Sequence, residues 1–174
     1  MIGYRHADAR YPFLWERSDQ PPARWHGRGE GPAHYFADSP DGAWAEFLRH
    51  EEITEVRDLE TIRRALWIVE LGDEPTALPK LPEDILLGNE DTYPMCRVEA
   101  QRIRSQEINR IEAPSAALQP AGVIRWRVEA GEHPVPSDGK VFVLFGARPD
   151  LVGSLAAVGG PRADLLERVQ HFSE

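Results

Sequence analysis

Three side chains that could together cleave a nucleotide lie in the segment between residues 24 and 46, namely Arg24, Tyr35 and Glu46. A guanidinium stays charged at every relevant pH and binds a phosphate through two parallel hydrogen bonds. An aromatic ring packs against a base or a sugar, and a fixed carboxylate stabilises positive charge that develops as a bond to a sugar breaks. Each residue alone fits an ordinary surface or core position, so the hypothesis depends on their combination.

A short strand is expected to carry the tyrosine. Glycine and proline break up residues 27–32, which predicts a loop there. The next five residues, Ala33–Ala37, are short, aromatic and alternating, which predicts a strand with Tyr35 on one face and His34 and Phe36 on the other. Tyr35 can then line a cleft.

A helix is expected to carry the glutamate. Ser39 is a good N-cap, a proline follows at the first helical position, and Asp41 lies near the positive end of the helix dipole. These signals predict a helix over Pro40–His50. Its apolar face would be formed by Ala43, Trp44, Phe47 and Leu48. Glu46 lies at the edge of that face, where a carboxylate can be half desolvated and point into a pocket.

Several stretches of the chain resemble the RES domain, a family named for an arginine, a glutamate and a serine and found as toxins in bacterial toxin-antitoxin pairs. The matching residues are, in chain order, Tyr4 and Arg5, Arg24 and Trp25, Tyr35 to Ser39, Glu46, Gln106, and the run Pro114, Ser115 and Ala116. The similarity covers residues 4–146. The sequence departs from the family pattern at Ala23, where glycine is usual, at His26, and at Ala117, where an arginine is often seen.

The resemblance implies that the chain consumes NAD, with a fold similar to that of ADP-ribosyltransferases. Characterised relatives break the bond between nicotinamide and ribose by phosphorolysis or hydrolysis, and some transfer ADP-ribose to a protein. On this basis we expect catalytic roles for Glu46, Arg5 and Tyr35. Glu46 would act at the ribose, and Arg5 and Arg24 are the candidates to bind the pyrophosphate. The expected NAD-binding residues are Arg24, Ser115 and Gln106.

The same resemblance implies a partner, an antitoxin with a helix-turn-helix DNA-binding region whose tail blocks the cleft. Two alternatives stay open. One is an ADP-ribosyltransferase that uses the same pocket on a protein acceptor. The other is a non-catalytic module that binds a nucleotide or a partner without turnover. Whether the chain forms a homo-oligomer is also left open.

Length and composition predict one globular domain over residues 1–174, with 41% hydrophobic and 28% charged residues. The N-terminus turns polar at once and no apolar run reaches membrane-spanning length, so we expect a cytoplasmic protein without membrane contact. Cys96 is the single cysteine, and the histidines are scattered, which argues against a disulfide and a metal site. A net charge of -9 argues against direct binding of nucleic acid.

The rest of the chain predicts the scaffold, a mixed α/β (α+β) domain with a twisted, mainly antiparallel sheet and flanking helices. Residues 64–71, 122–130 and 140–146 are expected as strands, the last two joined in a hairpin by the turn-forming residues 131–139. Residues 98–112 and 161–172 are expected as helices, with Gly159 and Gly160 as a helix cap. Residues 70–91 hold seven acidic side chains and predict an exposed loop, or alternatively a docking surface or flap.

Overall fold

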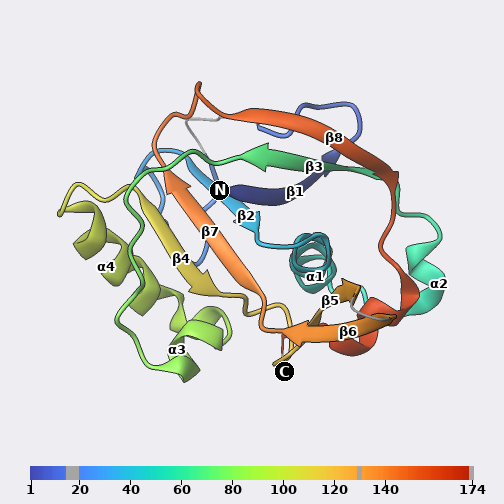
Figure 1. Cartoon of the computed structure of the whole chain (residues 1–174). Coiled ribbons are helices and arrows are strands. Elements are labelled where there is room, and N and C mark those ends of the chain that lie inside the picture. Colours follow the sequence, from blue (N-terminus) through green and yellow to red (C-terminus); the bar gives the residue numbers. More distant parts are fainter. Residues whose placement is uncertain (15–19, 129–130, 173–174) are drawn as a thin grey trace.

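The computed structural model describes residues 1–14, 20–128 and 131–172 of the chain (Figure 1). Its strands are β1 (Ile2–Asp8), β2 (Ala33–Ala37), β3 (Arg64–Glu70), β4 (Arg110–Pro114), β5 (Val123–Val128), β6 (Glu132–Ser137), β7 (Lys140–Phe145) and β8 (Val152–Gly159). Its helices are α1 (Pro40–His50), α2 (Val56–Leu59), α3 (Glu83–Leu87) and α4 (Tyr93–Arg104), with 3-10 turns η1 (Glu90–Thr92) and η2 (Ala163–Arg168).

The main sheet has the strand order β4-β7-β2-β1-β3-β8, and every pair of neighbouring strands in it is antiparallel. Strands β5 and β6 form a separate two-stranded antiparallel sheet. The predicted fold class, a mixed domain built on a mainly antiparallel sheet, is therefore confirmed.

The main sheet divides into two halves at its centre. Strand β1 pairs with β3 along its whole length, and β2 pairs with β7 along its whole length, whereas β1 and β2 share the single register pair Tyr4↔Ala37. Gly3 allows the close approach at this point, because a Cβ atom there would lie 2.8 Å from both Leu71 Cδ1 and Phe36 Cβ. Beyond this contact β1 and β2 separate, which leaves room for side chains between the two halves.

Helices α1 and α4 pack against one face of the sheet, and the loop residues Phe13, Leu14 and Leu151 pack against the other. The apolar face of α1 packs in one cluster with residues of β2, β3 and η2, including Ala37, Leu66 and Leu165. The buried face of α4 packs against β4 and β7. The opposite face of the sheet carries Phe36, which packs in a further cluster formed mainly by residues of β3 and β7. Tyr35 and Phe36 thus lie on opposite faces, as the alternation predicted.

The capping signals of α1 act as expected. The helix covers Pro40–His50, and the Ser39 hydroxyl accepts a hydrogen bond from the Gly42 N–H at 3.0 Å. Ala43, Trp44, Phe47 and Leu48 are all buried. Because these local signals and the apolar face agree, the side chain of Glu46 has a fixed place on the helix.

Four other predictions about elements were wrong. The helix expected over residues 98–112 begins at Tyr93 and ends at Arg104, and β4 occupies residues 110–114. Residues 131–139 are not a turn between β5 and β7, because they contain β6, which pairs with β5, while β7 pairs in the main sheet. Residues 161–172 hold only the six-residue turn η2, and Gly159 ends strand β8 instead of capping a helix.

Residues 70–91 are mostly irregular, as predicted, apart from the short elements α3 and η1. Among the described helices, none combines the length and the apolar character needed to cross a bilayer.

Candidate active site

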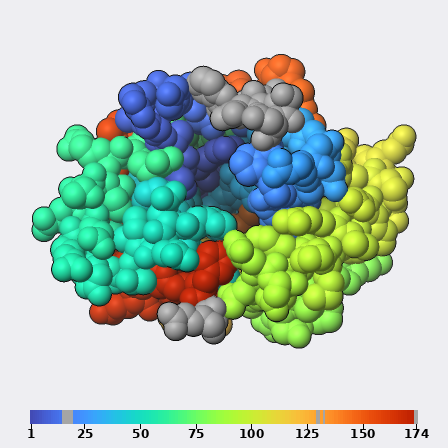
Figure 2. Space-filling model, turned by 180° about the vertical axis from the view of Figure 1, so that it is seen from behind, coloured from blue at the N-terminus to red at the C-terminus, as the bar shows by residue number. Residues whose placement is uncertain are grey.

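A cavity of about 710 Å³ opens where β1 and β2 separate, beside helix α1. Its lining comes from β1, β2 and α1, from residues 11–13 and 20–25 between β1 and β2, from Ala116, and from single residues of β3, α4, β4 and β7. Figure 2 shows a hollow at the centre of the face opposite to that seen in Figure 1. Pockets for small ligands and cofactors measure roughly 300–1,000 Å³, so this cavity is large enough for a nucleotide.

Arg5 enters the cavity from β1. Its guanidinium lies against the ring of Phe36, with Cζ 5.8 Å from the ring centre. Its Nη1 is buried and has no hydrogen-bond partner among the described residues. Burial lowers the pKa of Arg5 to about 10, so the side chain is still charged at neutral pH. A buried charged donor without a partner is costly, and this nitrogen is therefore available to an anion.

Arg64 and His6 lie beside Arg5 and line the same cavity. Arg64, the first residue of β3, donates a hydrogen bond from Nε to Nδ1 of His6 at 2.9 Å. Sequence reasoning did not assign either residue to the site. The one available signal for Arg64 was a charged side chain at the start of an otherwise apolar strand. We call Arg5, His6 and Arg64 the strand wall of the cavity.

Glu46 enters the cavity from α1, and its side chain is 29% exposed. The Ser115 hydroxyl donates a hydrogen bond to Oε1 of Glu46 at 2.9 Å. The other carboxylate oxygen, Oε2, lies 3.8 Å from Nε2 of His50, one helical turn further along α1. The carboxylate is therefore held from one side by a hydroxyl and approached from the other by an imidazole.

Ser115 is 4% exposed and lies behind Glu46, while its neighbours Pro114 and Ala116 reach the cavity surface. Its hydroxyl oxygen also accepts a hydrogen bond from the Ala117 N–H at 3.3 Å. The glutamate and the serine expected at the site are thus in direct contact, and the serine orients the glutamate.

Arg49 on α1 lines the cavity and is 2% exposed. Its Nη1 donates to the carbonyl oxygens of Ala116 and Gln170, and its Nη2 donates to the carbonyl oxygen of Gly88 and to Oδ1 of Asn89, both at 3.3 Å. Burial lowers the pKa of Arg49. This arginine, also missed from the sequence, fixes α1 to three other segments. We call Glu46, Arg49 and Ser115 the helix wall.

Tyr35 presents its ring to the cavity, but its hydroxyl is already engaged. The oxygen accepts a hydrogen bond from the Trp25 N–H at 3.1 Å and lies 3.0 Å from Nδ1 of His26. Nε2 of His26 lies 2.8 Å from the carbonyl oxygen of Pro21, which can only accept, so in neutral His26 the Tyr35 hydroxyl donates to Nδ1. Burial raises the pKa of Tyr35. The residue can offer an aromatic surface to a ligand.

Arg24 lines the cavity, and the terminal nitrogens of its guanidinium bind the segment that precedes α4. Nη2 donates to the carbonyl oxygen of Gly88 at 2.6 Å, and Nη1 donates to that of Leu86 at 3.0 Å. Its Cζ lies 4.6 Å from the ring centre of Tyr93, which also lines the cavity. For Arg24 to bind a phosphate through both terminal nitrogens, it would have to exchange these carbonyl partners.

Gln106 lies outside the cavity. Because α4 ends at Arg104, Gln106 falls in the exposed turn that follows the helix and is not among the lining residues. The structure therefore brings together five of the six expected site residues, four at the surface of the cavity and Ser115 directly behind Glu46. Among the described residues, no group of three or more His, Cys, Asp or Glu side chains is arranged to hold a metal ion.

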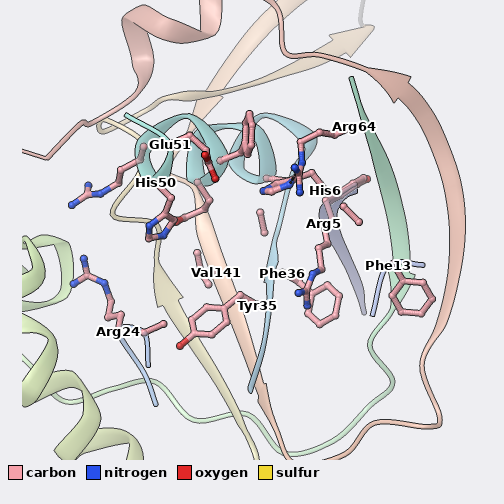
Figure 3. Close-up of a pocket in the computed structure, with 18 of the residues that line it drawn as sticks. Arg5, His6, Phe13, Arg24, Tyr35, Phe36, His50, Glu51, Arg64 and Val141 are labelled. Carbon is pink, nitrogen blue, oxygen red and sulfur yellow. Dashed lines mark hydrogen bonds and ion pairs between the residues drawn. The ribbon is translucent and has the colours of Figure 1, made fainter. Parts of the chain in front are cut away.

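Side chains from several elements surround the cavity. Figure 3 shows Arg5, His6 and Arg64 on one side and His50 and Arg24 on the other, with Tyr35 between them. The arrangement offers a carboxylate that can stabilise positive charge, guanidinium groups that can bind phosphate, and an aromatic ring that can support a planar group.

Comparisons with known proteins agree with this fold. A family model described as "RES domain" matches residues 3–156. No curated protein matches the sequence significantly. Among solved structures, the chain is similar to one in the "Crystal structure of the M.tuberculosis MbcT-MbcA toxin-antitoxin complex", with a TM-score of 0.62 and 16% identity, over 95% of this chain and 86% of that chain. At this identity the likeness shows a shared fold.

Proposed function

Because the chain belongs to the RES domain family, we propose that it is a toxin that cleaves NAD at the bond between nicotinamide and ribose. The observation that carries the proposal is that the Glu46 carboxylate and the Arg5 guanidinium line one cavity. The carboxylate is oriented by Ser115, and the guanidinium has an unpartnered nitrogen. We take residues 1–174 as one domain and expect it to act in the cytoplasm, where NAD is plentiful.

The chemistry of the reaction fits these residue types. Loss of neutral nicotinamide leaves positive charge spread over the ribose ring and its oxygen. The Glu46 carboxylate would stabilise that charge from close range, and the Ser115 hydroxyl would keep the carboxylate in place without competing for its second oxygen. The ring of Tyr35 would support nicotinamide or ribose.

Arg5 would bind the pyrophosphate, since its free nitrogen can donate to a phosphate oxygen. Arg24 is a further candidate for the pyrophosphate, on the condition that it releases its carbonyl partners. The bound dinucleotide would then place its ribose next to Glu46. Phosphate, water or a protein side chain would accept the ADP-ribose.

We further propose that a cognate antitoxin with a helix-turn-helix DNA-binding region neutralises the protein by covering the cavity. Two features support this partner, namely family membership and the similarity of the fold to a chain from a toxin-antitoxin complex. The cavity is open to one face of the molecule (Figure 2), so a polypeptide can reach it.

The test is to incubate the purified protein with NAD, with and without phosphate, and to separate the products by chromatography. Free nicotinamide together with ADP-ribose or its phosphorylated form is expected without any protein acceptor. Glu46→Gln should reduce the rate about a hundredfold, because a lost catalytic charge costs on the order of 3 kcal/mol. Ser115→Ala should have a smaller effect, about tenfold, because the carboxylate remains.

Glu55→Gln is the matched control, since Glu55 is exposed and caps α2 without a side-chain hydrogen bond. Expression of the wild-type protein should also arrest growth, and Glu46→Ala should relieve the arrest. Cleavage only in the presence of a protein acceptor would favour the ADP-ribosyltransferase. Equal growth of both strains and an unchanged NAD pool would indicate a binding module without turnover.

A further inference from the structure

The arginines of the described chain differ in what their guanidinium groups contact. Exposed arginines such as Arg102 and Arg162 form ion pairs with nearby carboxylates. Buried Arg110 donates to Thr76 and to backbone carbonyl oxygens of residues 71–74, and Arg24 and Arg49 likewise bind carbonyl oxygens. Arg5 and Arg64 also line the cavity, but each keeps at least one terminal nitrogen without a hydrogen-bond partner among the described residues.

The guanidinium of Arg64 is held through Nε, while its terminal nitrogens are available to a ligand. Its Nε donates to Nδ1 of His6 at 2.9 Å, and its Cζ lies 4.9 Å from the ring centre of Phe47. Among the described residues, its terminal nitrogens Nη1 and Nη2 donate no hydrogen bond. The side chain is therefore held in one orientation, and Nη1 and Nη2 are left to bind a ligand.

His6 is the residue that holds it. Its ring stacks on Trp44 with centroids 6.0 Å apart and an interplanar angle of 10°, and it meets the edge of Phe47 at 4.9 Å. To accept from Arg64, Nδ1 must be unprotonated. Burial, together with the positive charges of Arg64 and Arg5, lowers the pKa of His6 to about 3. The imidazole thus remains a neutral acceptor.

We propose that Arg64, oriented by His6, binds a phosphoryl group of the cavity's ligand. In the β1–β3 register Arg64 lies opposite Asp8 and Arg5 lies opposite Trp67, so the two arginines leave opposite faces of the sheet and Arg64 forms a contact point of its own. Asp8, which pairs with Arg64 in register and also lines the cavity, has its carboxylate hydrogen-bonded to Arg10, so the terminal nitrogens of Arg64 can donate to an anion. His6 is a positioning residue in this site.

The phosphoryl group could come from two sources, the pyrophosphate of a dinucleotide or a free phosphate ion. The proposal rests on the proposed function only for the identity of the dinucleotide, since the anion site is defined by Arg64 and its contact with His6. Binding measurements can therefore test it without any turnover.

The experiment is calorimetric titration of the intact protein with three probes, ADP-ribose, inorganic phosphate and adenosine, which lacks phosphate. Arg64→Gln should weaken binding of at least one phosphorylated probe by about tenfold to a hundredfold, as expected for loss of a charged hydrogen bond. Binding of adenosine should not change. Arg63→Gln is the matched control, because it removes the same charge from the preceding, exposed residue.

A pyrophosphate and a free phosphate ion as the source of the phosphoryl group give different titration results. If Arg64→Gln weakens ADP-ribose and phosphate competes with ADP-ribose, the site takes the pyrophosphate. If the variant weakens only phosphate, and phosphate binds together with ADP-ribose, the site takes a free phosphate. Equal effects of Arg64→Gln and Arg63→Gln on every probe, or no binding of either phosphorylated probe to the wild-type protein, would overturn the proposal.

The role of His6 is tested by His6→Leu and His6→Asn. His6→Leu removes the acceptor and should weaken the same probe several-fold, whereas His6→Asn keeps an acceptor near the position of Nδ1 and should restore most of the affinity. In the Arg64→Gln background, His6→Leu should have no further effect, because His6 acts through Arg64. An additive loss would mean that His6 only supports the fold.

Turnover of NAD by the same wild-type sample separates this proposal from the proposed function. If Arg64→Gln weakens the phosphorylated probe while the wild-type protein leaves NAD intact, the anion site stands and NAD cleavage fails. If NAD is cleaved and Arg64→Gln behaves like Arg63→Gln, NAD cleavage stands and the anion site at Arg64 fails.

Discussion

The two walls of the cavity differ in how far the protein itself satisfies their polar groups. On the helix wall, Glu46 accepts from Ser115, and the terminal nitrogens of Arg49 donate to three carbonyl oxygens and one amide oxygen. On the strand wall, Arg5 has a buried nitrogen without a partner and Arg64 is bonded only through Nε. The protein itself binds the guanidinium of Arg49 and Oε1 of Glu46 on the helix wall and leaves Oε2 of Glu46 to a ligand, whereas the strand wall leaves donors of both arginines to a ligand.

The two walls suit two different tasks, namely catalysis by a carboxylate and binding of an anion. A catalytic carboxylate works best when its position is fixed before the substrate arrives, because reorganisation would raise the barrier. A binding site for an anion must keep its donors free, which makes the empty protein less stable than it could be. Variants on the two walls should therefore change stability in opposite directions.

The largest effect is expected from Arg49→Met on the helix wall. The substitution keeps most of the apolar volume but leaves the carbonyl oxygens of Ala116 and Gln170 buried without this donor. We expect a loss of about 3 kcal/mol in the free energy of unfolding, measured by chemical denaturation. Arg63→Met, at an exposed position, should change it by less than about 0.5 kcal/mol. Equal stability of the two variants would show that the helix wall does not depend on Arg49.

Arg5→Met on the strand wall should have the opposite effect on stability. It removes a buried donor that has no partner and places an apolar chain against Phe36. We expect the free energy of unfolding to rise by about 1 kcal/mol, while affinity for ADP-ribose falls by about 2 kcal/mol, or thirtyfold. Denaturation and calorimetry on the same sample measure both values. Loss of stability together with binding would mean that the two walls do not differ.

The sequence predicted the helix wall better than the strand wall. Strand β2 and helix α1 carry strong local signals, namely the aromatic alternation of residues 33–37 and the cap formed by Ser39 and the following proline. These signals fixed the positions of Tyr35 and Glu46. The place of Ser115 beside Glu46 followed from the family resemblance, since no local signal connects residues 69 positions apart.

The strand wall depends on pairing that no local pattern encodes. Strand β1 mixes apolar and polar residues without a clear alternation, and only its pairing with β3 and its separation from β2 place Arg5 in the cavity. The errors elsewhere have the same cause. Residues 132–137 contain two prolines, which suggested a turn, yet they pair with β5 in a separate two-stranded sheet where proline is tolerated. Gln106 was misplaced because the polar residues after Arg104 leave the helix boundary undefined.

The last prediction concerns the pH dependence of stability that the strand wall contributes. The pKa of His6 is lowered from 6.5 to about 3 in the folded protein, because burial and the neighbouring Arg64, Arg5 and His50 disfavour its charged form. Between pH 6.5 and 3 the unfolded chain therefore binds more protons at this residue than the folded chain does. The contribution of neutral His6 to stability is complete above pH 6.5 and is lost as the pH falls through this window.

One such group changes the free energy of unfolding by at most about 1.4 kcal/mol per pH unit. The wild-type protein should accordingly lose more stability than His6→Asn between pH 6.5 and 4, because asparagine does not titrate while the carboxylates contribute equally to both proteins. Denaturation curves at several pH values measure the difference. The helix wall has no corresponding buried neutral base, so Ser115→Ala should follow the wild-type pH dependence. Parallel curves for wild type and His6→Asn would show that folding does not lower the pKa of His6. The imidazole would then be protonated in the same pH range as in the unfolded chain and could not serve as a neutral acceptor for Arg64.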